Sequence, residues 1–280
     1  MLLAARNIVK AWLLVLVLVG IFGLVGWLLD GVRGLSIFVF CALLVAAGAY
    51  WTFDRVVIGM VGARELPVGE APLLHSTVER LASRAGILKP RLYLIPDGLP
   101  IAAATGRGVR RSAVIVSTGC VAACAPAELE AVLAHEIAHV RLHDVQIQTA
   151  AAVSAAVLLE TSRIGGWFER SLLFVLAPVA AACVHLLVSP KREFAADQFA
   201  AKLCDSPHGL ADALGRFEQA SDLVGFEGSP ATEPLFTINP FDEGWPARLF
   251  VTHPPIAERV RRLRALDPGE AERAESEAAA

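Results

Sequence analysis

Two long apolar runs at the start of the chain dominate the pattern of hydrophobic and polar positions. Residues 11–29 and 35–53 each contain 19 residues without a charge, close to the roughly 20 apolar residues of a bilayer-spanning helix. Trp12, Trp27 and Trp51 lie near the ends of these runs, where amphipathic rings settle at the lipid–water interface. The pattern predicts two transmembrane helices. A cleaved signal peptide with a buried core helix is the alternative, although the first run exceeds the usual h-region of about 7–15 residues.

A second apolar region follows in residues 145–189. Residues 145–159 carry no charge, and residues 171–189 are interrupted only by Pro178 and His185. This pattern predicts a second hydrophobic helical hairpin. Its first helix is short for a full span, so an interfacial helix or a core helix is the alternative there.

The polar segments predict shorter helices and a few strands. Residues 71–86 have apolar residues at helical spacing and end on Gly86, a common helix stop. Residues 91–96 and 112–118 are short β-branched runs that predict strands, and the glycine-containing residues 100–108 predict a connection between them. Helices are also predicted from Pro126 to Asp144 and over 189–203, 207–226 and 253–266, with a loop over 227–250 and a frayed or disordered acidic tail over 268–280.

These elements divide the chain into five segments. They are an N-terminal transmembrane hairpin (1–53), the first half of a catalytic domain (54–144), the second hydrophobic hairpin (145–189), the second half of the catalytic domain (190–266) and the tail (267–280).

Composition supports a membrane protein. The chain is 55% hydrophobic and 19% charged, against about 45–50% and about 25% in an ordinary soluble domain. The net charge of −3 gives no sign of nucleic-acid binding. The five cysteines are odd in number and suggest no disulfide framework, and Cys120 and Cys124 lack the second Cys/His pair of a typical zinc site.

The sequence His-Glu-x-x-His at residues 135–139 is the strongest chemical motif. On a helix, His135 and His139 share one face about 6 Å apart along the axis, so both imidazoles can bind one Zn²⁺ ion. Glu136 is rotated from His135 by about 100° and reaches a water on the metal instead. His143 lies about 12 Å from His135 along a straight helix, too far to bind the same ion, and is expected at the surface or beside the ligands.

The third ligand is expected to be Glu193, in the segment SPKREFAADQ. Two histidines and a carboxylate make up the three protein ligands of a catalytic zinc site, with one position left for water. Asp197 lies one helical turn further on and is placed to accept an N–H from a ligating histidine. Alone, Glu-x-x-x-Asp also fits a solvated acidic helix face, so the inference depends on the His-Glu-x-x-His motif.

The distribution of basic residues predicts the orientation in the membrane. His135, His139 and Glu193 share one ion only if an even number of crossings separates residues 144 and 190. The segments on the side of the site hold seven basic residues and the opposite loops hold three. Since Lys and Arg favour the cytoplasmic side, we expect a multi-pass protein of the cell membrane with a cytoplasmic catalytic domain. The seven are Arg6, Lys10, Arg55, Arg64, Arg141, Lys191 and Arg192, and the three are Arg33, Arg163 and Arg170.

This arrangement resembles the HtpX-type membrane zinc metallopeptidases, relatives of the CAAX prenyl endopeptidases. The shared features are two N-terminal spans, His-Glu-x-x-His-x-x-x-x-Asp ending at Asp144, a hydrophobic hairpin, Glu-x-x-x-Asp, and Thr-His-Pro-Pro from Thr252 followed by Arg259. The resemblance implies a mainly α membrane protein with an α+β zincin-like (gluzincin) catalytic domain and a small β-sheet. It implies one Zn²⁺ per chain and a role in protein quality control and the stress response.

The resemblance also implies roles for individual residues. His253 is implicated in catalysis, Asp144 in supporting a zinc ligand, and Arg259, Ala102 and Ala104 in binding substrate. From the residues alone, His253 before two prolines fits a structural role equally well. The segment PIAAATG (100–106) departs from the family pattern at Ile101 and Ala103, which bears on substrate placement and not on the metal chemistry.

We therefore expect zinc-dependent hydrolysis of peptide bonds in membrane or membrane-proximal proteins, with Glu136 as the base and zinc with His253 stabilising the oxyanion. We expect the substrate backbone to add to the predicted strand 112–118. The lipid bilayer is a further partner, and homo-oligomerisation is left open. The alternatives are a non-catalytic zinc-binding membrane scaffold or sensor and an intramembrane site-two-type protease.

Overall fold

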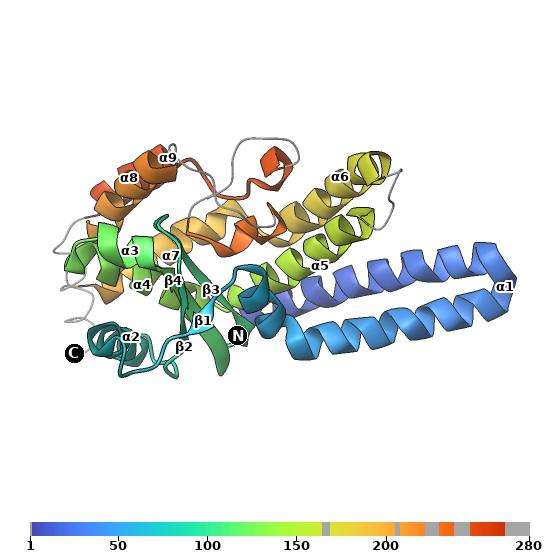
Figure 1. Cartoon of the computed structure of the whole chain (residues 1–280), viewed down its shortest axis with the longest axis horizontal. Helices are drawn as coiled ribbons and strands as arrows, with labels where there is room; N and C mark the ends of the chain where they lie inside the picture. Colours follow the sequence, from blue (N-terminus) through green and yellow to red (C-terminus); the bar gives the residue numbers. More distant parts are fainter. Residues whose placement is uncertain (1, 164–168, 205–207, 222–229, 238–246, 267–280) are drawn as a thin grey trace.

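The computed structural model describes residues 2–163, 169–204, 208–221, 230–237 and 247–266 (Figure 1). Within these residues the chain is mainly helical and has one small sheet. The predicted acidic tail, 268–280, lies outside the described residues.

The long N-terminal helix α1 (Leu2–Met60) folds back on itself. Asp30 and Gly31 have non-helical φ and ψ angles, so α1 forms two antiparallel arms (Figure 1). The arms approach closely at Gly26 and Gly34, because a Cβ atom on Gly26 would lie 2.4 Å from the Gly34 carbonyl oxygen. The chain reversal in α1 thus falls between the two apolar runs of the sequence, and glycine permits the close packing of the two arms beside it.

The described residues contain one helix that is long and apolar enough to cross a membrane. This stretch, Val19–Gly48, includes the fold in α1, and only 6% of its apolar window is buried. The bent pairs α4–α5 and α6–α7 raise the number of candidate spans to three if each pair counts as one. That each arm of α1 crosses the membrane separately stays a prediction.

Helices α5 (Val145–Arg163) and α6 (Glu169–Leu187) lie in the region of the predicted second hydrophobic hairpin. They pack against each other through small and branched side chains such as Ala155, Ala177 and Val184, all fully buried. Both helices extend from the body of the molecule on the same side as the arms of α1 (Figure 1).

The sheet has four strands in the order β1–β2–β4–β3. Strand β2 (Arg91–Ile95) runs parallel to β4 (Arg111–Ser117), whereas β1 (Arg64–Glu65) and β3 (Ala102–Gly108) are antiparallel to their neighbours. Strand β4 lies in the centre and is buried at every residue except Arg111. The sheet therefore has β3 as one of its edges.

Two expectations about this sheet are wrong. Residues 100–108 were expected to be a connection, but Ala102 to Gly108 form β3. The run is alanine- and glycine-rich, so pairing with β4 and not intrinsic strand propensity makes it a strand. The predicted strand 112–118 was expected to accept the substrate, but β4 is already paired on both sides and has no open edge.

The other helices surround the sheet and form the body of the molecule. The remaining elements are α2 (Pro72–Arg84), α3 (Thr118–Ala123), α4 (Pro126–Arg141), α7 (Pro190–Leu203), α8 (Gly209–Ser221), η2 (Pro230–Leu235), η3 (Ala247–Phe250) and α9 (Ile256–Arg264). Helices α2, α4, α7 and α8 start within two residues of the predicted positions, and α9 starts three residues late. Helix α3 was not predicted, and the predicted loop 227–250 contains two short 3₁₀ helices, η2 and η3.

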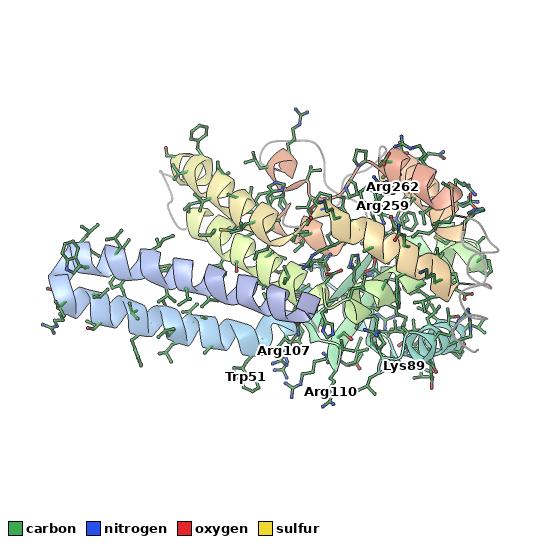
Figure 2. The ribbon with its side chains drawn as sticks, turned by 180° about the vertical axis from the view of Figure 1, so that it is seen from behind. Trp51, Lys89, Arg107, Arg110, Arg259 and Arg262 are labelled. Carbon is green, nitrogen blue, oxygen red and sulfur yellow. The ribbon has the colours of Figure 1, made fainter. Side chains whose placement is uncertain are left out.

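Basic and aromatic side chains lie where α1 meets the body. Figure 2 shows Trp51, Arg107 and Arg110 at this end of the arms. The guanidinium of Arg107 lies 5.7 Å from the centre of the Trp51 ring and 3.6 Å from the Asp54 carboxylate. Such a belt is typical of the junction between a membrane-embedded segment and a soluble one.

Candidate metal centre

Helix α4 carries the central residues of the site. It begins at Pro126, and the side chain of Glu128 turns back to accept a hydrogen bond from the Ala125 N–H at 2.8 Å. From Ala131 to Val140 the helix is buried on all sides. His135 and Glu136 are at most 1% exposed. A polar group in such a place needs a partner, because burial without one costs free energy.

The two histidines of α4 and one carboxylate of α7 converge. The Nε2 atoms of His135 and His139 lie 3.1 Å apart, and each is 3.4 Å from an oxygen of Glu193. Glu193 is placed there because α7 starts at Pro190 and packs along α4. All three ligand atoms lie within 4.8 Å of one another.

The geometry and chemistry of this group fit a zinc ion. Two ligands that bind one tetrahedral Zn²⁺ at roughly 2.0–2.1 Å lie about 3.3–3.4 Å apart, close to the separations seen here. Oxygen Oε2 of Glu193 is buried and has no hydrogen-bond partner among the described residues. Two imidazoles and a carboxylate are also the donor set of a catalytic zinc site.

Carboxylates support both histidines from behind. Nδ1 of His135 lies 3.0 Å from Oδ1 of Asp197, and Nδ1 of His139 lies 3.3 Å from Oδ2 of Asp144. A proton on Nδ1 would leave Nε2 available to bind a metal ion, and a carboxylate beside Nδ1 favours that tautomer. Asp144 also pairs with Arg192 at 2.9 Å.

Glu136 lies next to this group but does not belong to it. One of its oxygens accepts a hydrogen bond from the Thr237 hydroxyl at 2.7 Å, and the other is buried without a hydrogen-bond partner among the described residues. Burial raises the pKa of the Glu136 carboxyl, which suits a group that takes up a proton during a reaction.

Arg259 reaches the site from α9. Its side chain is fully buried, and Figure 2 labels it among the helices of the body. Nε and Nη2 donate to the two oxygens of Asp197 at 2.9 and 2.7 Å, and Nη1 donates to the Thr237 carbonyl at 2.6 Å. Although burial opposes the charge on Asp197, Arg259 holds the pKa of this carboxyl below its usual value. The expected substrate-binding residue therefore makes its hydrogen bonds to the chain itself.

His253 also faces the metal-binding group. Its Nε2 atom lies 3.7 Å from Oε2 of Glu193, and its Nδ1 atom lies 2.8 Å from Oε1 of Glu233. Glu233 and Thr237 were not identified from the sequence. Both fall in the segment expected to be a loop, and neither belongs to a motif that could have pointed to it.

The remaining predicted residues lie on or beside β3 and α4. The carbonyl of Ala102 accepts a hydrogen bond from the Thr237 N–H at 3.0 Å, whereas Ala104 packs against Val140. His143 follows the end of α4 with a φ of 63° and is outside the metal-binding group. Because α4 ends at Arg141, the helix predicted to reach Asp144 is three residues too long.

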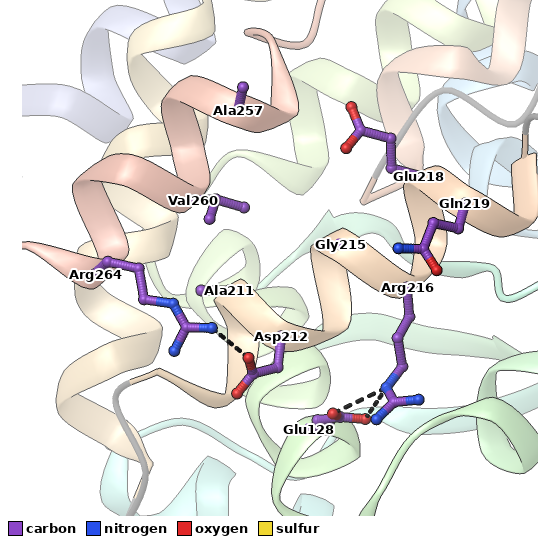
Figure 3. Close-up of a pocket in the computed structure, with 10 residues that line it drawn as sticks. All are labelled: Glu128, Ala211, Asp212, Gly215, Arg216, Glu218, Gln219, Ala257, Val260 and Arg264. Carbon is purple, nitrogen blue, oxygen red and sulfur yellow. Dashed lines mark hydrogen bonds and ion pairs between the residues drawn. The ribbon is translucent and has the colours of Figure 1, made fainter.

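A separate hollow of about 700 Å³ lies between α8, α9 and the start of α4. Figure 3 shows the ion pairs Arg264–Asp212 and Arg216–Glu128 among the residues that line it. The metal-binding residues do not line it. This hollow is therefore distinct from the candidate metal centre.

Comparison with known proteins gives consistent matches. Residues 69–267 match the model of a family described as peptidase family M48. The chain is 39% identical to a protease HtpX homolog of Persephonella marina, over 91% of this chain and 96% of that protein. It is 40% identical to one of Pelotomaculum thermopropionicum, over 93% and 99%, and 39% identical to one of Pyrococcus furiosus, over 91% and 94%.

A solved structure also matches. It is the crystal structure of S. mikatae Ste24p, which is 19% identical, with a TM-score of 0.46, over 94% of this chain and 66% of that chain.

Proposed function

The chain belongs to peptidase family M48 and is a membrane zinc metallopeptidase, and from this premise we propose which residues perform its chemistry. His135, His139 and Glu193 hold one zinc ion, and Glu136 is the general base of peptide-bond hydrolysis. The observation that carries the proposal is the convergence of three buried ligand atoms within 4.8 Å, with the Glu136 carboxyl beside them.

The chain's own groups supply the proton transfers and the charge stabilisation. A zinc ion, when bound, acts as a Lewis acid and lowers the pKa of its water to about 7. Glu136 accepts a proton from the attacking water and passes it to the leaving amine. His253 presents Nε2 to the substrate carbonyl oxygen as negative charge develops there, and a charged imidazole donates from both nitrogens. One such donor contributes roughly 2.7–4 kcal/mol.

The substrate adds to the edge strand β3. Successive residues of an antiparallel edge strand alternate in the direction of their backbone groups. The Ala102 carbonyl points away from β4, as its hydrogen bond from Thr237 shows, and by this alternation the backbone of Ala104 points the same way. An extended polypeptide that pairs with Ala102 and Ala104 lies beside the metal centre and is recognised through its main chain, which suits a peptidase with broad sequence tolerance.

The site faces the cytoplasm and acts on membrane or membrane-proximal proteins. Both arms of α1 and the α5–α6 hairpin enter the cell membrane, since they extend from one side of the body and α1 exposes large apolar side chains such as Leu28, Phe40 and Leu44. The excess of basic residues at the body end supports the cytoplasmic orientation.

Replacement of the general base tests the proposal. Glu136→Gln, purified with zinc, is expected to lose proteolysis of an unfolded membrane protein by at least about 10²–10⁴-fold while it retains one zinc ion per chain. Glu130→Gln is the matched control, because Glu130 lies on the same helix and pairs with Arg80 away from the site. Unchanged proteolysis by Glu136→Gln would contradict the assignment.

Two other functions are not favoured. A zinc-binding scaffold does not require a buried carboxyl beside the metal-binding group, as Glu136 provides. In an intramembrane site-two-type protease the motif lies within a spanning helix, whereas α4 packs against the sheet and helices of the body. Absence of turnover by zinc-loaded protein would favour the scaffold.

A further inference from the structure

Glu233, in the short helix η2, is a buried carboxylate that the hydrolysis described above does not use. It is 1% exposed. Its Oε1 atom accepts from the backbone N–H of Thr252 at 3.0 Å and lies 2.8 Å from Nδ1 of His253. Its Oε2 atom accepts from the Thr252 hydroxyl at 2.7 Å. Three contacts thus fix both oxygens and the plane of the carboxylate.

The Glu233 carboxylate forms an ion pair with a single side chain among the described residues. In the described part of the chain, the one ion pair formed by this carboxylate is with His253. A buried carboxylate is expensive unless it is paired and hydrogen-bonded. The pairing therefore holds the two side chains together more firmly than an exposed ion pair would.

The contact decides which edge of the His253 ring faces the metal centre. An imidazole ring has a broad, roughly two-fold preference about its outer torsion, so two ring orientations are available. With Nδ1 held by Glu233, Nε2 points toward Glu193, at 3.7 Å from its Oε2 atom. The flipped ring would turn a carbon atom toward Glu193 and break the bond to Glu233.

We propose that Glu233 is a positioning residue for hydrolysis: it holds His253 by Nδ1 so that Nε2 is presented to the substrate carbonyl oxygen. The inference rests on the proposed function, because His253 has to act on the substrate for its orientation to matter. The hydrogen bonds and the ion pair of the Glu233 side chain in the described residues are with Thr252 and His253, and not with the proposed zinc ligands or the proposed base.

The main competing role for Glu233 is structural, since the same carboxylate ties η2 to the segment before α9 through Thr252. A structural role and a positioning role differ in one respect. An effect that operates through His253 vanishes when His253 is absent, whereas a general loss of structure does not.

The test is a double-mutant cycle on the full-length, zinc-loaded protein in detergent. Glu233→Met removes the acceptor and keeps the volume. It is expected to lower kcat by about 10–10²-fold with KM within about twofold. Glu233→Gln keeps an acceptor for Nδ1 and is expected to retain kcat within about fivefold. In a His253→Ala background, Glu233→Met is expected to cause no further loss.

A second readout does not depend on turnover. A phosphinic peptide imitates the tetrahedral transition state, and its affinity is expected to fall in Glu233→Met by the same factor as kcat/KM. The zinc content is expected to stay at one ion per chain. Glu128→Gln is the matched control, because Glu128 is also a buried glutamate but pairs with Arg216 far from His253.

Three results would overturn the inference. They are an unchanged kcat in Glu233→Met, an equal loss with and without His253, and a loss of zinc that accounts for the whole effect. If Glu233→Met does not fold, Glu233→Gln is the deciding variant. A loss of kcat above about fivefold in Glu233→Gln that is also seen in the His253→Ala background would contradict the inference. Glu136→Gln is measured in parallel to distinguish failure of this inference from failure of the proposed function. If Glu136→Gln loses activity and Glu233→Met keeps it, only the role of Glu233 is rejected.

Discussion

Two aspartates lie behind His135 and His139, the two histidines that we propose bind zinc. Asp197 contacts Nδ1 of His135 and Asp144 contacts Nδ1 of His139. Each aspartate is in turn held by an arginine, Arg259 or Arg192. Both histidines thus have carboxylates beside Nδ1 that are outside the proposed ligand set.

Neutralising these aspartates should weaken zinc binding without removing a ligand. Asp197→Asn and Asp144→Asn are each expected to lower zinc affinity by about 10–100-fold, the usual effect of losing such a partner. Competition with a fluorescent chelator measures this affinity. Asp212→Asn, in the exposed ion pair with Arg264, should leave zinc affinity unchanged. Equal affinities in all three variants would count against this account.

At the scale of single residues, the sequence predicts the convergence of His135, His139 and Glu193 but not the side chains that surround them. His135, Glu136 and His139 follow from spacing on one helix, and Glu193 follows from the need for a third ligand. Glu233 and Thr237 could not be found in this way, because only the tertiary fold brings them to the site. A side chain whose contact spans 20 residues of sequence, as the contact of Glu233 with His253 does, leaves no periodic pattern.

At the scale of elements, helices could be predicted more accurately than strands. Helices α4 and α7 start at prolines, a local signal that does not depend on the rest of the fold. Strand β3 has no such signal, because its alanines and glycines favour a strand only when β4 is alongside. The error had a functional consequence, since it moved the expected substrate-binding edge to a strand in the centre of the sheet.

The irregular end of β3, where its pairing with β4 shifts register, contains a glycine with an unusual backbone conformation. Gly106 has a φ of 148°, and a Cβ atom there would lie 2.3 Å from the Arg111 carbonyl oxygen. Gly106→Ala is therefore expected to destabilise the protein by about 1–3 kcal/mol through backbone strain, with further loss from the clash. Gly98→Ala is the control, because its Cβ would meet nothing within 4 Å. Thermal unfolding of both variants in the same detergent measures the difference, and equal midpoints would refute the prediction.

At the scale of the whole molecule, the tip of the apolar arms and the candidate metal centre lie at opposite ends of the structure. The fold at Asp30 and Gly31 forms the far tip of α1, and Figure 1 shows the sheet and the metal-binding helices at the other end. The sequence indicated this division through its apolar runs. The packing of α5 against α1 and β3 could not be read from the sequence, because both partners are distant along the chain.

The orientation can be tested by labelling from outside the cell. In a background without the five native cysteines, Val32→Cys lies at the tip of α1 and Val68→Cys lies in the body, and both positions are exposed. A membrane-impermeant maleimide should label Val32→Cys in intact spheroplasts and Val68→Cys only after permeabilisation. The reverse pattern would place the metal centre outside the cytoplasm.

The edge of β3 already has an occupant. Phe236 pairs with Ala103 in an antiparallel bridge, and Thr237 binds the Ala102 carbonyl and the Glu136 carboxyl. A polypeptide that adds to this edge thus competes with a segment of the same chain, whose effective concentration is on the order of millimolar. Under the proposed function, a dilute, folded protein would lose that competition. An unfolded chain confined to the same membrane would reach a comparable local concentration, so confinement to the bilayer would select substrates independently of side-chain identity.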